Sequence, residues 1–99
     1  DLIVEDNIDI IKAKKLFSKG ISLFNVYAIC VSPKTNGLME IMSTENLLKE
    51  VNSYGNYGII ALVKGRNKAR KKSVRLIENW LVTHSDLTGF KSHYNQNSF

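Results

Sequence analysis

Residues 57–66, Tyr-Gly-Ile-Ile-Ala-Leu-Val-Lys-Gly-Arg, decide the fold of this chain. Five apolar residues in a row begin at Ile59, which is typical of a strand covered on both faces. The charge of Lys64 and the glycine after it end this run and precede a helical pattern. We therefore expect a central strand over residues 57–63 and a helix over residues 67–83.

The segment 67–83 has the spacing of an amphipathic helix. Apolar or small residues share one arc of the helical wheel: Ala69, Ser73, Val74, Leu76, Ile77, Trp80 and Leu81. The opposite arc is polar and mostly basic: Lys68, Lys71, Lys72, Arg75 and Asn79. The pattern predicts that one side of the helix covers the sheet, with Trp80 in the core.

A β-hairpin is expected before the central strand. Val26 to Ser32 and Leu38 to Ser43 are short runs rich in apolar or β-branched residues. The connection between them contains Pro33 and the pair Asn36-Gly37, and Asn and Gly readily adopt the positive φ of a tight turn.

Two further helices are predicted. The first has Asp6 or Asn7 as its N-cap and ends between Lys19 and Phe24, depending on whether Gly20 stops it. Its apolar residues recur at helical spacing: Ile10, Ala13, Phe17, Ile21 and Phe24. The second helix has Ser43 or Thr44 as its N-cap, carries Leu47, Leu48 and Val51, and closes at Gly55.

These elements predict one α+β domain over residues 1–84, in which helices pack on a small mixed sheet made of the β-hairpin and the central strand. The element order is α-β-β-α-β-α, and the helix between the second and third strands allows a crossover connection. Residues 85–99 are expected to be a polar, loosely held tail, with few residues that could anchor it: Leu87, Phe90, Tyr94 and Phe99.

Composition agrees with a single small globular domain. The chain has 99 residues, of which 43% are hydrophobic and 23% charged, so it can bury one core. Its one cysteine, Cys30, has no partner for an internal disulfide, which favours a reducing, cytoplasmic location. The longest mainly apolar stretch, Ile21 to Val31, is far shorter than the ~20 residues that span a bilayer, so no membrane association is expected.

Basic residues are concentrated in one segment. Seven of the 14 Lys and Arg residues lie within twelve positions: Lys64, Arg66, Lys68, Arg70, Lys71, Lys72 and Arg75. No acid occurs from Val51 to Ile77, and Glu78 is the first one downstream. The cluster also occupies a helix N-terminus, where the macrodipole already favours anions and opposes each cation by roughly 0.3–1 kcal/mol. An external anion would relieve this repulsion.

Three interpretations of the cluster are open: a solvated helix face, a nucleic-acid phosphate backbone, or an acidic protein or other phosphate ligand. The candidate nucleic-acid-binding residues are Lys64, Arg66, Lys68, Lys71, Lys72 and Arg75. Arg70 is ranked below Arg66 and left out of this set, because it projects toward the apolar side of the first turn of the helix. Tyr57 is expected to be the exposed aromatic residue nearest the basic loop. The basic group on the first helix, Lys12, Lys14, Lys15 and Lys19, follows acids in the order that the dipole favours and is interpreted as structural.

No pattern supports catalysis, a cofactor or a metal. Phosphate-loop motifs are absent around Gly65. Cys30, His84 and His93 lack a metal-ligand spacing, and Glu40 is the only carboxylate of the hairpin and is expected to face solvent. The alternative to nucleic-acid binding is a protein-interaction or assembly domain, including a homo-oligomer, that uses the hairpin edge or the tail.

Overall fold

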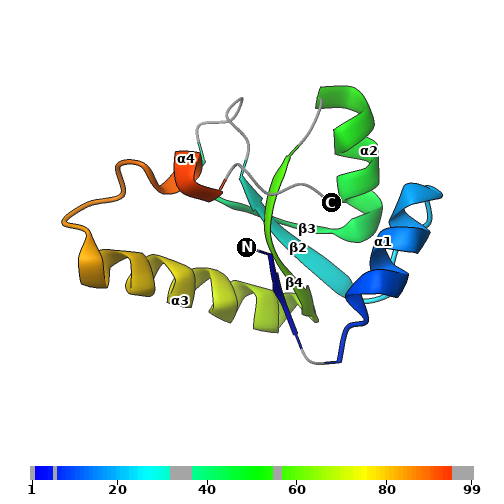
Figure 1. Ribbon diagram of the computed structural model, residues 1–99, viewed down its shortest axis with the longest axis horizontal. Helices are drawn as coiled ribbons and strands as arrows, with labels where there is room; N and C mark the ends of the chain where they lie inside the picture. The colour runs from blue at the N-terminus through cyan, green and yellow to red at the C-terminus, as the bar shows by residue number, and fades with distance from the viewer. Residues whose placement is uncertain (1, 6, 32–36, 55–56, 95–99) are drawn as a thin grey trace.

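A computed structural model describes residues 2–5, 7–31, 37–54 and 57–94, and it confirms the α+β class (Figure 1). The predicted helices are α1 (Ile10–Ser18), α2 (Thr44–Tyr54) and α3 (Arg66–Thr83), and the predicted strands are β2 (Val26–Val31), β3 (Glu40–Ser43) and β4 (Gly58–Lys64). Two short elements are additional: β1 (Ile3–Val4) and α4 (Phe90–Tyr94). The order of the six predicted elements is therefore confirmed.

The described strands form one mixed sheet in the order β1-β4-β2-β3. Strand β4 lies between β2, to which it is antiparallel, and β1, to which it is parallel. Strands β2 and β3 are antiparallel, as a hairpin requires, and the turn residues 32–36 lie outside the described residues. The central position of β4 explains its continuous apolar run, because both of its faces and both of its edges are covered.

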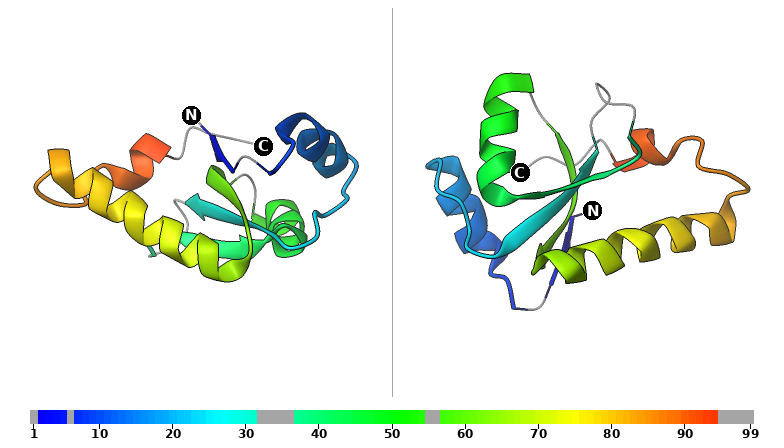
Figure 2. Two further views of the ribbon diagram at one scale, coloured as in Figure 1. Left: turned by 90° about the horizontal axis from the view of Figure 1, so that it is seen from below. Right: turned by 180° about the vertical axis from the view of Figure 1, so that it is seen from behind.

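Helices cover both faces of the sheet, with α1 and α2 on one side and α3 and α4 on the other (Figure 2). The buried core of the α3 side consists of Ile29, Val31, Ile60, Ala61, Val63, Ala69, Leu76 and Phe90. The buried core of the α1 and α2 side consists of Val26, Ala28, Cys30, Leu47, Tyr57, Ile59 and Leu62. A β-bulge at Ile60 interrupts the alternation, because Ile29 pairs with Ala61 while Cys30 pairs with Ile59.

Helix α1 is shorter than its apolar pattern indicated. Its N-cap is Asp9, whose carboxylate accepts the backbone N–H groups of Ile11 and Lys12, so the predicted caps Asp6 and Asn7 were wrong. At the other end Gly20 adopts φ +76°, with the Gly20 N–H bonded to the carbonyl of Phe17 and the Ile21 N–H to that of Leu16. This Schellman motif ends the helix.

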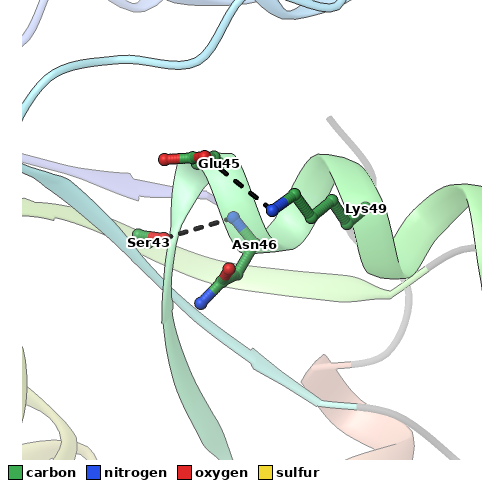
Figure 3. A network of polar contacts seen from close by, with 4 residues as sticks. All are labelled: Ser43, Glu45, Asn46 and Lys49. Carbon is green, nitrogen blue, oxygen red and sulfur yellow. Dashed lines mark hydrogen bonds and ion pairs between the residues drawn. The ribbon is translucent and has the colours of Figure 1, made fainter.

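Helix α2 begins at the predicted cap. The Ser43 hydroxyl accepts the N–H of Asn46 at 3.2 Å, and Glu45 forms an exposed ion pair with Lys49 one turn later (Figure 3). Thr44 is buried, and its hydroxyl accepts the Leu23 N–H at 2.8 Å and donates to the Leu23 carbonyl at 2.9 Å. Thr44 thereby ties α2 to the loop that precedes β2. The predicted closing residue, Gly55, lies outside the described residues.

Replacing Thr44 by valine is expected to destabilise the protein by about 1–3 kcal/mol, because the isosteric side chain leaves the Leu23 N–H without its partner and the Leu23 carbonyl with only the longer bond from the Val26 N–H. The free energy of unfolding, measured by urea denaturation, tests this. Ser43→Ala removes only the helix cap and should cost about 1 kcal/mol. A Thr44→Val loss below that of Ser43→Ala would contradict the anchoring role.

Helix α3 buries a narrower stripe than predicted. Ala69 and Leu76 are buried and Trp80 packs against the core, as expected. Val74 and Leu81, also placed on the apolar arc, are 56% and 45% exposed, because the contact with the sheet is centred on Ala69 and Leu76.

Part of the predicted tail is attached to this side of the core. Phe90 at the start of α4 is completely buried, and its ring meets that of Trp80 edge-on at 5.3 Å. The Trp80 indole N–H also donates to the Asp86 carbonyl at 2.9 Å. Phe90 and Tyr94, two of the residues named as possible anchors, therefore pack against the core.

Candidate nucleic-acid interface

The basic cluster lies where β4 ends and α3 begins. Lys64 is the last residue of β4, Gly65 adopts φ +88°, and α3 follows at Arg66. The first turn of α3 contains no acid and no side chain caps it, while the Ala69 N–H bonds to the Gly65 carbonyl at 3.1 Å. The positive end of the helix dipole is therefore surrounded by cationic side chains, as the sequence predicted.

Four of the six candidate residues form one stripe along α3. Lys68, Lys71, Lys72 and Arg75 follow the spacing i, i+3, i+4 and i+7, which places their side chains next to one another on the same face. Lys72 is half-buried and the other three are exposed. Arg66 is also exposed but lies on another face of the helix, four residues before Arg70.

None of these cations is neutralised by a carboxylate in the part of the chain that the structure describes. The ion pair found among those residues is Glu45–Lys49 of α2, remote from the cluster in the fold. Arg70, which was expected to lie toward the apolar side, is exposed. The charge excess noted in the sequence thus persists in three dimensions, and the like charges repel one another.

Lys72 opens onto a cleft of about 350 Å³ between α3 and the edge of the sheet. The other residues that line this cleft are Ile3, Val4, Glu5, Asn7 and Val63. Glu5 thus shares a cleft with Lys72 without forming an ion pair with it among the described residues. Since β1 was not predicted, sequence reasoning did not connect Glu5 with Lys72.

A second cleft, of about 310 Å³, lies beside Lys64. Asn7 lines both clefts, so the two adjoin. The remaining residues around the second cleft are Ile8, Asp9, Lys12, Ala13, Leu16, Leu23, Phe24 and Val26. Lys12, which was interpreted as structural, therefore shares a cleft with a residue of the basic cluster.

The expected aromatic residue is not at this site. Tyr57 is only 6% exposed and belongs to the core beneath α2, at the opposite end of β4 from Lys64, so this prediction was wrong. The exposed aromatic residue beside the basic loop is instead Phe24, which is 96% exposed and lines the second cleft. Sequence reasoning missed Phe24 because helical spacing placed it in α1, although Gly20 was the signal that the helix stops earlier.

Cys30 and Glu40, two further reactive side chains, lie next to each other in the β2–β3 pair. Burial raises the pKa of the Cys30 thiol to about 12, with a smaller contribution from Glu40, so the thiol is a poor nucleophile at neutral pH. Glu40 was expected to face solvent, but its antiparallel register sets it opposite Cys30 and buries its Oε2. Within the described ranges, no group of His, Cys, Asp and Glu side chains could hold a metal ion.

No described helix combines the length and the apolar character needed to cross a bilayer. Comparisons with protein-family models, with curated proteins and with solved structures give no match to this chain. A functional inference therefore depends on the chemistry of the chain's own residues.

Proposed function

We propose that this protein is a nucleic-acid-binding domain that contacts the phosphate backbone through the loop and helix from Lys64 to Arg75. The observation that carries the proposal is the stripe of Lys68, Lys71, Lys72 and Arg75, whose charges have no described carboxylate partner. Together with Lys64 and Arg66, these residues give the end of β4 and the first turns of α3 a positive charge that phosphates complement in sign.

The physical argument is the cost of the arrangement in the free protein. Cations three or four residues apart on a helix repel by about 0.2–0.5 kcal/mol per pair, and those near the N-terminus oppose the dipole as well. Phosphate oxygens remove both penalties on binding. Lysines supply point charges, whereas Arg66 and Arg75 can also bind phosphate in a bidentate manner. Such contacts give affinity and register, and they carry no base sequence.

A salt titration tests the proposal. A 20-base-pair duplex DNA, a single-stranded RNA of equal length and polyglutamate are the probes, and the dissociation constant is measured between 50 and 200 mM NaCl. With about four to six phosphate contacts, affinity for the duplex should fall on the order of 10² to 10³-fold over this range. Weak binding that does not depend on salt would contradict the proposal, and preference for polyglutamate would favour an acidic protein partner.

The second candidate function is a protein-interaction domain. Strand β3 is an edge strand that pairs only with β2 among the described strands, so its outer edge can accept a strand from another chain. Light scattering of the 99-residue chain between 10 and 500 μM distinguishes this candidate from nucleic-acid binding. Self-association that is insensitive to salt would favour it over nucleic-acid binding.

A further inference from the structure

The turn at residues 23–26 exposes the side chain of Phe24 to solvent. The Val26 N–H donates to the Leu23 carbonyl at 3.3 Å, and Asn25 adopts φ +56°, a conformation that asparagine tolerates better than most residues. The backbone of Leu23 is also hydrogen-bonded to the hydroxyl of Thr44. Phe24 therefore stands on an anchored turn, and it is 96% exposed.

This turn is hydrogen-bonded to the basic loop. The Gly65 N–H donates to the Asn25 carbonyl at 2.8 Å, and Val26 lies opposite Lys64 in the β2–β4 register. Phe24, Lys64 and Lys12 line one cleft as a result. An apolar, planar surface and positive charge thus meet at a single place.

We propose that this cleft selects single-stranded nucleic acid, with one base stacked on Phe24 and the adjoining phosphates at Lys64 and Lys12. This inference rests on the proposed function and specifies its substrate class. Stacking on an aromatic side chain contributes to single-strand binding for every base, because each base has a planar face. In a duplex those faces are covered by neighbouring bases, and an acidic polypeptide has none, so neither uses Phe24.

The cleft also determines where the strand runs. Asp9 lines it as well: its Oδ1 accepts the N–H groups of Ile11 and Lys12 and caps α1, and its negative charge favours the phosphate at Lys64 over the one at Lys12. From there the adjoining cleft leads past Asn7 to Lys72. A strand with its base at Phe24 therefore continues onto the stripe of α3.

The experiment compares Phe24→Ala, Phe24→Trp and the control Val82→Ala, which removes another exposed apolar side chain (80% exposed) at the far end of α3. The probes are fluorescein-labelled dT12 and the dT12·dA12 duplex, measured by anisotropy at 100 mM NaCl. Phe24→Ala should weaken dT12 binding by about 5- to 100-fold and change duplex binding by less than about twofold. Phe24→Trp and Val82→Ala should bind both probes like the wild type.

Two results would overturn the inference: dT12 binding unchanged in Phe24→Ala, or equal losses for dT12 and the duplex. The charge-reversal variant Lys68→Glu/Lys71→Glu/Lys72→Glu separates this failure from that of the proposed function. If it loses both probes while Phe24→Ala loses neither, phosphate binding stands and stacking is refuted. If the wild type binds neither probe, the proposed function itself is refuted.

Discussion

Reversing Lys68, Lys71 and Lys72 to glutamate is expected to abolish nucleic-acid binding at 100 mM NaCl. Each lysine that contacts phosphate contributes a slope of about −0.9 to the dependence of log affinity on log salt for a duplex. Loss of three contacts should therefore flatten this slope by about 2.7 units, and repulsion from the new carboxylates weakens binding further. We expect at least a 100-fold rise in the dissociation constant, which a salt series by anisotropy measures.

A matched variant controls for net charge. Lys14, Lys15 and Lys19 belong to α1 and its C-cap, are exposed, and line neither of the two clefts beside the cluster. Reversing these three lysines changes the net charge by the same six units and should weaken binding by less than about tenfold. Equal losses in the two triple variants would show that total charge, and not the surface of α3, determines binding.

The stability of the α3 variant provides an independent check. Glutamate near the N-terminus of α3 favours the helix dipole, and Lys68→Glu also removes like-charge repulsion with its neighbours on the stripe. The reversed protein should therefore unfold at the same temperature as the wild type or at a higher one. A large fall in the melting temperature would mean that binding was lost through unfolding.

Phe90→Ala is expected to have the largest effect on stability, a loss of about 3–5 kcal/mol. The side chain is completely buried and packs against the rings of Trp80 and Tyr94, so its removal leaves a cavity between α3, α4 and the sheet. Because domains of this size have about 5–15 kcal/mol of stability in total, the variant should be close to unfolding. Urea denaturation followed by far-ultraviolet circular dichroism measures the change.

Leu87→Ala is the matched control in the same segment. Leu87 is 38% exposed, and its truncation should cost less than about 1 kcal/mol. If Phe90→Ala is equally mild, residues beyond 84 contribute little to the core and the prediction of a separable tail holds. A large loss confined to Phe90→Ala would place the domain boundary after α4.

The candidate site was accessible to sequence reasoning only in part. Counting charges identified Lys64 to Arg75, and helical spacing already grouped Lys68, Lys71, Lys72 and Arg75, because both properties belong to one continuous segment. The positions of Phe24, Lys12 and Glu5 in the two clefts beside the cluster could not be found in this way. Each comes from a segment at least 40 residues away in the chain from the cluster residue beside it.

The sequence by itself determined the α+β class, the central strand β4, the hairpin and the extent of α3. Periodicity, caps and glycine stops act over a few residues, so a single chain displays them directly. Only the tertiary structure decided the parallel pairing of β1, the burial of Phe90 and the hydrogen bond that joins Gly65 to Asn25. These contacts connect segments that are distant in sequence, and they form because the sheet offers edges and apolar faces that no local pattern records.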